Sequence, residues 1–182
     1  MTRIPLPASI EDTPQSARPM LEQVKAQLGS VPNLFRLTAT SPAALRGYLG
    51  LSGALSGGEL DAPTRERVAL AVSQLNSCQY CLAAHTYIGK NIAKLDDAEI
   101  AANRKGGSSD PRADVAVRFA VKLVETRGSV SDADLSAVKL AGFSDAEIVE
   151  IIAHVALNTL TNYLNEALGT PIDFPAVSAE VA

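Results

Sequence analysis

The sequence predicts an all-α protein, and three observations support that fold class. Aromatic residues make up only 4% of the chain and tryptophan is absent, whereas alanine and leucine are abundant, which favours closely packed helices over a β-sandwich. Apolar residues recur at helical spacing through most of the chain, and no segment shows the convincing apolar–polar alternation of a half-buried strand. Capping residues stand in front of several periodic segments, as they do at helix starts.

The chain has the length of one domain. Its 182 residues, 47% of them hydrophobic, can bury a sizeable core, and this composition does not favour disorder. We expect a single domain over residues 16–170. Residues 1–15 contain three prolines and are expected to form an extended arm. Residues 171–182 begin with a proline that prevents the last helix from continuing, and they are expected to form an extended tail.

Start and stop signals divide the domain into short helices. Ser131 and Ser144 each open a capping box, and Ser77 is the expected N-cap of a helix that begins with a cysteine. The expected helices cover residues 16–28, a short segment after Pro32, residues 41–56, 61–75, 78–94, 96–106 and 111–126, a short segment from residue 131, and residues 144–168.

Two segments have an unusual composition. Glycine recurs every three residues in the expected helix over residues 41–56, at positions 47, 50 and 53, so we expect another helix or a subunit to approach closely there. The alternative is a weak, partly irregular helix, because each interior glycine costs about 1 kcal/mol relative to alanine. Residues 103–110 combine glycine, serine and charged residues, and they are expected to form the most mobile loop of the chain.

Charge and hydropathy exclude several classes of function. The net charge is −4, and no cluster of basic residues suggests a nucleic-acid partner. The longest apolar runs fall short of the ~18–20 residues of a membrane span. Prolines interrupt the apolar residues of positions 1–7, unlike those of a signal peptide. We therefore expect a cytoplasmic protein, and in a reducing compartment a Cys-x-x-Cys pair is more often catalytic or metal-binding than structural.

Both cysteines of the chain and one of its two histidines stand close together in the sequence. Cys78 and Cys81 are three residues apart, and His85 follows Cys81 by four. On one helix, His85 leans back onto Cys81, and Cys78 is a neighbour of Cys81. The preceding helix carries Glu66, which an antiparallel hairpin about residues 76–77 sets level with His85. The predicted order along the hairpin is Glu66, His85, Cys81, Cys78.

These residue types suit thiol chemistry. A thiolate is the nucleophile, and a cysteine with an ordinary pKa of about 8.5 is mostly protonated at neutral pH. A helix N-terminus and a neighbouring base both favour its ionisation, and a carboxylate beside the imidazole orients that base. A second cysteine within reach converts a sulfenic acid into a disulfide. The arrangement therefore predicts a thiol peroxidase or a dithiol–disulfide oxidoreductase.

The spacing Glu66-x11-Cys78-x2-Cys81-x3-His85 on two consecutive helices resembles the alkylhydroperoxidase AhpD core of the carboxymuconolactone decarboxylase superfamily. The surrounding residues 65–75 and 81–85 resemble it as well. The segments 158–163 and 172–175 resemble the peroxidase-related branch of the superfamily, so the likeness spans most of the chain. The resemblance implies an AhpD-like helical bundle in which a central antiparallel helix hairpin carries the motif.

The same resemblance implies roles for the motif residues. Cys81 would be the peroxidatic cysteine, Cys78 the resolving cysteine, and Glu66 with His85 the proton relay of an antioxidant alkyl hydroperoxide reductase. No bound cofactor or metal is implied, and an external lipoyl or thioredoxin-like dithiol would reduce the disulfide. The resemblance also implies a homo-oligomer, a trimer or a hexamer. Some members carry a histidine just before the second cysteine, where this chain has Tyr80.

The cysteine pair has other interpretations. Both thiols could be buried and inert, or they could bind zinc together with His85 and Glu66. A redox sensor or disulfide-relay module would cycle the same disulfide without peroxide turnover. A lactone decarboxylase, an activity found in the superfamily, would not need the cysteines. In many Cys-x-x-Cys proteins the first cysteine has the lower pKa, but we choose Cys81 as the attacking residue because its base is one helical turn away.

The remaining polar residues of the apolar segments receive simpler interpretations. His154 stands in an apolar helix and is expected to be a core or interface histidine whose hydrogen bonds are satisfied. Tyr80 is expected to pack rather than to react. Asn158 and Asn162 lie one turn apart on the last long helix, and the sequence assigns them no partner.

Overall fold

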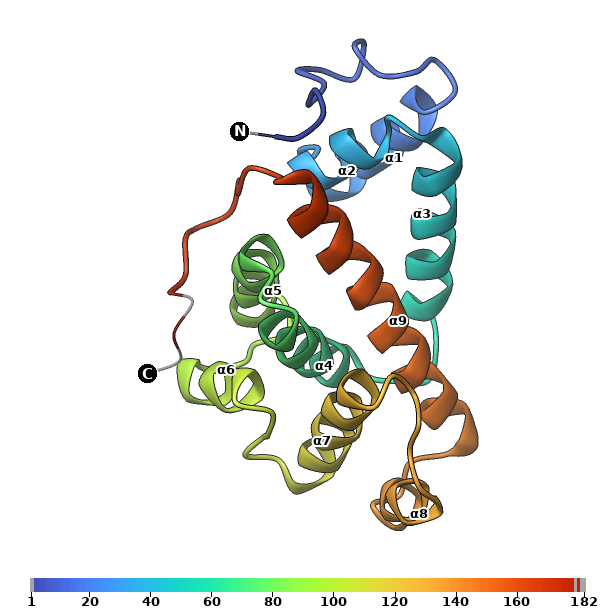
Figure 1. Cartoon of the computed structure of the whole chain (residues 1–182), viewed down its shortest axis with the longest axis vertical. Helices are drawn as coiled ribbons and strands as arrows, with labels where there is room; N and C mark the ends of the chain where they lie inside the picture. The colour runs from blue at the N-terminus through green and yellow to red at the C-terminus, as the bar shows by residue number, and fades with distance from the viewer. Residues whose placement is uncertain (1, 179, 181–182) are drawn as a thin grey trace.

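The structure is a computed structural model that describes residues 2–178 and 180, and this part of the chain is all-α, as predicted (Figure 1). Within these residues there is no β-strand. No helix among them is both long and apolar enough to cross a lipid bilayer. The helices are α1 (Arg18–Leu28), α2 (Asn33–Thr38), α3 (Pro42–Ser56), α4 (Ala62–Leu75), α5 (Gln79–Asn91), α6 (Asp97–Arg104), α7 (Pro111–Glu125), α8 (Asp132–Leu140) and α9 (Asp145–Leu168).

Most helices begin where the sequence places a capping residue, and two of them end at a left-handed glycine. Capping boxes at Ser131 and Ser144 open α8 and α9, as predicted. Helices α1 and α9 end at Gly29 and Gly169, whose φ angles of 77° and 63° are left-handed. Each N-cap contributes about 1 kcal/mol to stability. The other side chains that cap a first turn, in α3, α4, α6 and α7, are Ser41, Asp61, Asp96 and Asp110.

Helix α4 is the centre of the fold. It contacts α5, α6, α7 and α9, which surround it in Figure 1, and its residues 68–73 are all buried. The largest core cluster joins Val68 and Val72 of α4 to Phe119 of α7 and Ile151 of α9. A helix that is enclosed on several sides by others is held firmly in position. Helix α4 therefore provides a rigid support for the side chains near its start.

The first three helices form a smaller layer beside this core. Ala17, Leu21, Ala39 and Leu45 make its apolar cluster. The expected close approach at the glycines of α3 is not made within the described chain, because a Cβ atom at positions 47, 50 or 53 would meet no atom within 4 Å.

The described residues before α1 and after α9 form no helix but are fixed to the helices by hydrogen bonds. The Arg3 backbone N–H donates to the Leu168 carbonyl oxygen (2.8 Å), closing the start of the arm onto the end of α9. In the tail, the Asp173 carboxylate accepts from the Asn33 backbone N–H at the start of α2 (2.7 Å). Residue 1 of the predicted arm and residues 179 and 181–182 of the predicted tail lie outside the described residues.

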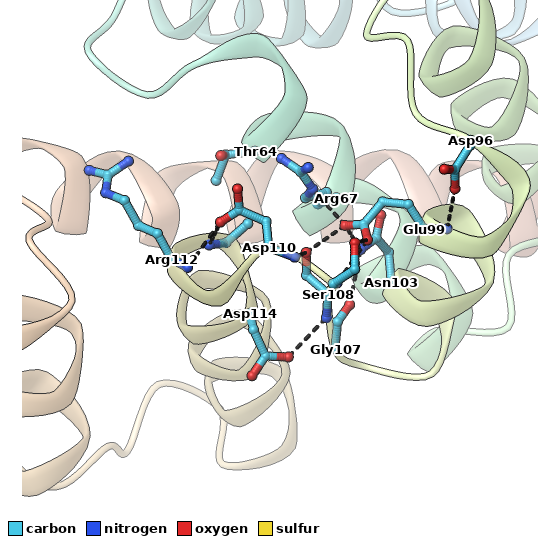
Figure 2. Close-up of polar contacts among 12 residues, drawn as sticks. Thr64, Arg67, Asp96, Glu99, Asn103, Gly107, Ser108, Asp110, Arg112 and Asp114 are labelled. Atoms are coloured by element: carbon cyan, nitrogen blue, oxygen red, sulfur yellow. Dashed lines mark hydrogen bonds and ion pairs between the residues drawn. The ribbon is translucent and has the colours of Figure 1, made fainter.

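The loop that we expected to be mobile is bound to a buried carboxylate (Figure 2). Glu99 of α6 is 6% exposed and accepts hydrogen bonds from Asn103 (2.9 Å), from the hydroxyls of Ser108 and Ser109, and from the Ser109 backbone N–H (2.8 Å). Arg67 of α4 adds an ion pair at 2.7 Å. We call these five residues the Glu99 cluster. These contacts tie the loop to α4 and α6, which the composition of residues 103–110 did not lead us to expect.

Candidate active site

The turn between α4 and α5 sets the position of the first cysteine. Ser77 adopts a left-handed conformation with φ 55°, so it is not the N-cap that the sequence predicted. Cys78, with extended φ and ψ of −82° and 98°, is the N-cap instead, and its Sγ accepts from the Cys81 backbone N–H (3.3 Å). A cap must have extended φ and ψ while its side chain turns back to the first turn, and Cys78 meets both conditions. The Cys78 sulfur therefore lies at the N-terminus of α5.

The hairpin brings the carboxylate and the imidazole together across α4 and α5. The Glu66 Oε2 and His85 Nδ1 atoms are 2.8 Å apart, and the two side chains are 17% and 20% exposed. Burial favours the neutral imidazole, but the charge of Glu66 and its hydrogen bond outweigh burial and raise the pKa of His85. Because Nδ1 is occupied by Glu66, Nε2 is the ring nitrogen that can exchange a proton with a third group.

The two cysteines form a hydrogen-bonded pair of unlike thiols. Cys78 is 0% exposed and Cys81 3% exposed, and the Cys78 Sγ donates to the Cys81 Sγ at 2.7 Å. This hydrogen bond lowers the pKa of Cys81 to about 6 against the effect of burial, and His85 and the side-chain amides of Asn165 and Asn162 lower it further. The same interaction, together with burial, raises the pKa of Cys78. Cys81 is therefore the more acidic thiol of the pair.

Helix α9 contributes asparagines that sequence reasoning did not connect to the cysteines. Asn165 Nδ2 donates to the Cys81 Sγ (3.2 Å). Asn162 accepts from the Asn76 side chain (2.8 Å) and so holds the turn between α4 and α5. Asn158, Asn162 and Asn165 recur at helical spacing in an apolar helix and are buried, and buried amides need hydrogen-bond partners. The helical spacing of these asparagines was the sequence signal that they would be buried. It does not indicate which side chains they would bond.

An apolar cavity of about 220 Å³ opens beside Cys81. His85 shares its wall, so the Cys81 side chain and the imidazole line the same space. Phe174 of the tail closes one side and meets the Tyr80 ring edge-on, with ring centroids 5.8 Å apart, and it lies 6.1 Å from the Tyr87 ring. Tyr80 thus packs, as predicted. The apolar side chains that line the cavity include Leu34, Phe35, Tyr48, Tyr80, Ile88 and Phe174.

A second cavity of about 220 Å³ lies on the other side of the Glu66–His85 pair, between α3, α4, α5 and α9. We call it the polar cavity. His154 lies on its wall and is 7% exposed, but its Nε2 has no hydrogen-bond partner among the described residues. No protein group among the described residues bonds this nitrogen, so the expectation that its hydrogen bonds are satisfied stays a prediction. The polar side chains that line the cavity include Ser52, Arg65, Glu66, His85, His154 and Asn158.

The zinc interpretation requires at least three ligand side chains to converge. Within the described residues no group of three or more His, Cys, Asp or Glu side chains is placed to hold a metal ion. Glu66 and His85 are bonded to each other, and Cys78 donates to Cys81. The four residues thus form two linked pairs rather than a tetrahedral ligand set.

Comparisons with known proteins bear on family and fold. Residues 42–126 match the model of the carboxymuconolactone decarboxylase family. An alkylhydroperoxidase AhpD core from Ralstonia eutropha JMP134, an uncharacterized peroxidase-related protein, is similar over 94% of this chain and 92% of that one, with 29% identity and a TM-score of 0.84. No protein with a curated function matches the sequence.

Two more distant structures share the fold. An uncharacterized peroxidase-related protein from Silicibacter sp. TM1040 has 24% identity and a TM-score of 0.81, with 93% of this chain and 91% of that one covered. The debrominase Bmp8 in complex with 2,3,4-tribromopyrrole has 18% identity and a TM-score of 0.78, with 95% and 94% covered. The family match contains the whole α4–α5 hairpin, and the solved structures share the fold of almost the whole chain. Residues 42–126 therefore match the carboxymuconolactone decarboxylase family, and the chain has the AhpD-like helical fold.

Proposed function

We propose that the protein is an enzyme, a thiol-dependent reductase of organic hydroperoxides. One observation carries this proposal: the Cys81 thiol, whose pKa is lowered, lies on the wall of an apolar cavity. The Cys78 thiol is 2.7 Å from it, and the imidazole of His85, paired with Glu66, lines the same cavity. A peroxidase needs a thiolate, a proton donor for the leaving oxygen, and a second thiol for the oxidised product. The family match supports the same chemistry.

The proposed reaction begins with the Cys81 thiolate. The His85–Glu66 pair accepts the thiol proton, and the thiolate attacks the terminal oxygen of the hydroperoxide. The O–O bond breaks, His85 returns the proton to the alkoxide, and an alcohol leaves while Cys81 becomes a sulfenic acid. The Cys78 thiol then attacks the Cys81 sulfur, water leaves, and the disulfide forms. Two thiols are thus oxidised as one hydroperoxide becomes an alcohol and water.

Access to the sulfurs supports this order. Cys81 lies on the wall of the apolar cavity, whereas Cys78 is 0% exposed and is not among the lining residues. A substrate in the cavity therefore meets Cys81 first. The reductant must enter by the same route, which favours a narrow dithiol such as a lipoyl group over a bulky thioredoxin-like surface. We propose that such an external dithiol reduces the Cys78–Cys81 disulfide. We also propose that the protein acts in the cytoplasm as a homo-oligomer and without a bound cofactor.

The test of the proposal is a stopped-flow experiment on the reduced protein with excess cumene hydroperoxide. We expect both thiols to disappear rapidly, with one peroxide consumed per chain. Thiols that survive peroxide but oxidise with a disulfide donor would establish the redox-relay alternative. Lactone decarboxylation that persists in a variant with both cysteines changed to serine would establish the decarboxylase alternative.

The apolar cavity predicts a preference for organic hydroperoxides that depends on Phe174. Removing this ring in Phe174→Ala should lower kcat/KM for cumene hydroperoxide about tenfold, because an apolar substrate loses roughly 1–2 kcal/mol of contact, and should change the value for hydrogen peroxide by less than about twofold. Ile172→Ala is the matched control, since Ile172 belongs to the same tail and is 44% exposed. Equal losses with both peroxides would show that Phe174 only supports the fold.

A further inference from the structure

His154 takes no part in the reaction proposed above, yet its environment is unusual for a core residue. It is 7% exposed, and its Nε2 has no hydrogen-bond partner among the described residues. Buried side-chain nitrogens in folded proteins nearly always bond to protein or to ordered water. Since the ring lies on the wall of the polar cavity, water in that cavity is the partner within reach of Nε2.

The polar cavity has the size and the lining to hold several such waters. Its volume is about 220 Å³, whereas one water occupies roughly 10–15 Å³ on this type of measure. Hydroxyl, amide, guanidinium and carboxylate groups line it, from Ser52, Asn158, Arg65 and Glu66. Each water can therefore find the two to four polar partners that ordered water requires.

Glu66 connects this cavity to the thiol site. Its Oε2 atom is bonded to His85 Nδ1, while no described residue bonds its other oxygen, Oε1. Glu66 and His154 line the same cavity, on α4 and α9 respectively. A single water bonded to both Oε1 and the His154 Nε2 would satisfy both atoms, and water-mediated hydrogen bonds are nearly as favourable as direct ones.

We propose that His154 is a positioning residue of the thiol site, which acts through water in the polar cavity on the free oxygen of Glu66. It holds the carboxylate oriented toward His85, and the paired imidazole in turn stabilises the Cys81 thiolate. The inference rests on the proposed function for its biological purpose, but the coupling itself requires no peroxide.

The charges around His154 are consistent with a neutral imidazole in this role. Burial and then the charge of Arg65 hold the pKa of His154 below its usual value, although Glu150 and Glu66 oppose them. The Glu150 carboxylate, on the same helix, is itself bound by the backbone N–H groups of residues 59 and 60 at 2.9 and 2.8 Å. His85 of α5 and Tyr48 of α3 are the other titratable groups on the cavity wall. A neutral ring can donate to water without adding a charge near Arg65.

The test compares the ionisation of Cys81 in His154→Phe, His154→Gln and the unmodified chain, followed by thiolate ultraviolet absorbance against pH. Loss of the water-mediated bond frees the Glu66 side chain to turn away from His85, and a carboxylate that is less well oriented stabilises cationic His85 less. The Cys81 thiolate then becomes less favourable, so its midpoint should rise by about one pH unit in His154→Phe. Glutamine keeps a polar group that can bond water, so the Cys81 midpoint in His154→Gln should stay close to that of the unmodified chain.

Two results with folded His154 variants would overturn the inference. One is an unchanged midpoint in a folded His154→Phe protein, and the other is an equal shift in both variants, which would indicate packing alone. If His154→Phe does not fold, the imidazole resonances of His154 provide the second measurement. They should titrate differently in Glu66→Gln, because coupling between two groups is reciprocal, and identical titration would also overturn the inference.

The two proposals fail separately. A protein whose thiols ignore peroxide, but whose Cys81 midpoint moves in His154→Phe, would refute the peroxidase and leave the coupling of His154 to the thiol intact. Rapid oxidation of the thiols by peroxide, combined with an unchanged Cys81 midpoint in His154→Phe, would support the peroxidase and refute the coupling of His154 to the thiol.

Discussion

The Cys81→Ser variant should lose peroxide turnover by a factor on the order of 10³ or more, the effect of removing an enzymatic nucleophile. A serine hydroxyl at this position stays protonated, because the hydrogen bonds from Cys78 and Asn165 that stabilise a thiolate are far too weak to ionise an alcohol. The assay is consumption of cumene hydroperoxide with a dithiol reductant present. Retained turnover would exclude Cys81 as the attacked residue.

The Cys78→Ser variant is the matched control. A serine at position 78 can still donate to Cys81 and is a good N-cap for α5, so the first oxidation should keep its rate within about tenfold. Without a resolving thiol, the reaction should stop at the Cys81 sulfenic acid, which a sulfenic-acid trapping reagent detects by mass spectrometry. A trapped sulfenic acid in Cys81→Ser instead would exchange the roles of the two cysteines.

The Glu99→Ala variant should have the largest effect on stability, a loss of about 3 kcal/mol in the free energy of unfolding at neutral pH. The substitution leaves Arg67 without its buried ion-pair partner and leaves the Ser109 N–H without an acceptor. Urea unfolding followed by circular dichroism measures the loss. Asp97→Ala is the control, because Asp97 lies on the same helix but is 80% exposed, and its surface ion pair is worth less than about 1 kcal/mol. Equal losses in both variants would contradict a special role of the Glu99 cluster.

The contribution of Glu99 to the free energy of unfolding should also decrease as the pH falls. Burial alone raises the pKa of this carboxyl, but hydrogen bonds from Ser108, Ser109 and Asn103 outweigh burial and hold it well below its ordinary value of 4.5. A carboxyl whose pKa is lowered on folding stabilises the protein fully above the ordinary value and loses that contribution as the pH falls toward the folded pKa. The stability difference between the unmodified chain and Glu99→Ala should therefore shrink steadily below pH 4.5.

Local signals in the sequence predicted the helices well. Capping residues such as Asp61 and Ser144 act within one turn of their own helix, so their effect can be inferred without the rest of the chain. The hairpin geometry of Glu66 and His85 was also predictable, since two helices with a short turn must pack against each other. The start of α5 was displaced by one residue, because the left-handed φ of Ser77 depends on how the turn closes onto Ser73.

Contacts between distant parts of the chain were not predictable. Asn165 reaches Cys81 across 84 positions, and the tail brings Phe174 to the cavity only after α9 has been placed. The composition of residues 103–110 suggested a mobile loop, since nothing local indicates that Glu99 is buried beneath it. The unpartnered nitrogen of His154 is likewise a property of the space between four helices, which no single segment encodes.

The aromatic residues around the apolar cavity have a spectroscopic consequence. The chain contains four tyrosines and no tryptophan, so its intrinsic fluorescence comes from tyrosine. Tyr48 and Tyr80 line the cavity of Cys81 and Tyr87 stands against Phe174, whereas Tyr163 is 63% exposed. Two of the four emitters therefore line the cavity of the sulfur that changes its charge and oxidation state in the proposed reaction. If that reaction takes place, tyrosine emission would report the redox state of the protein without an attached label.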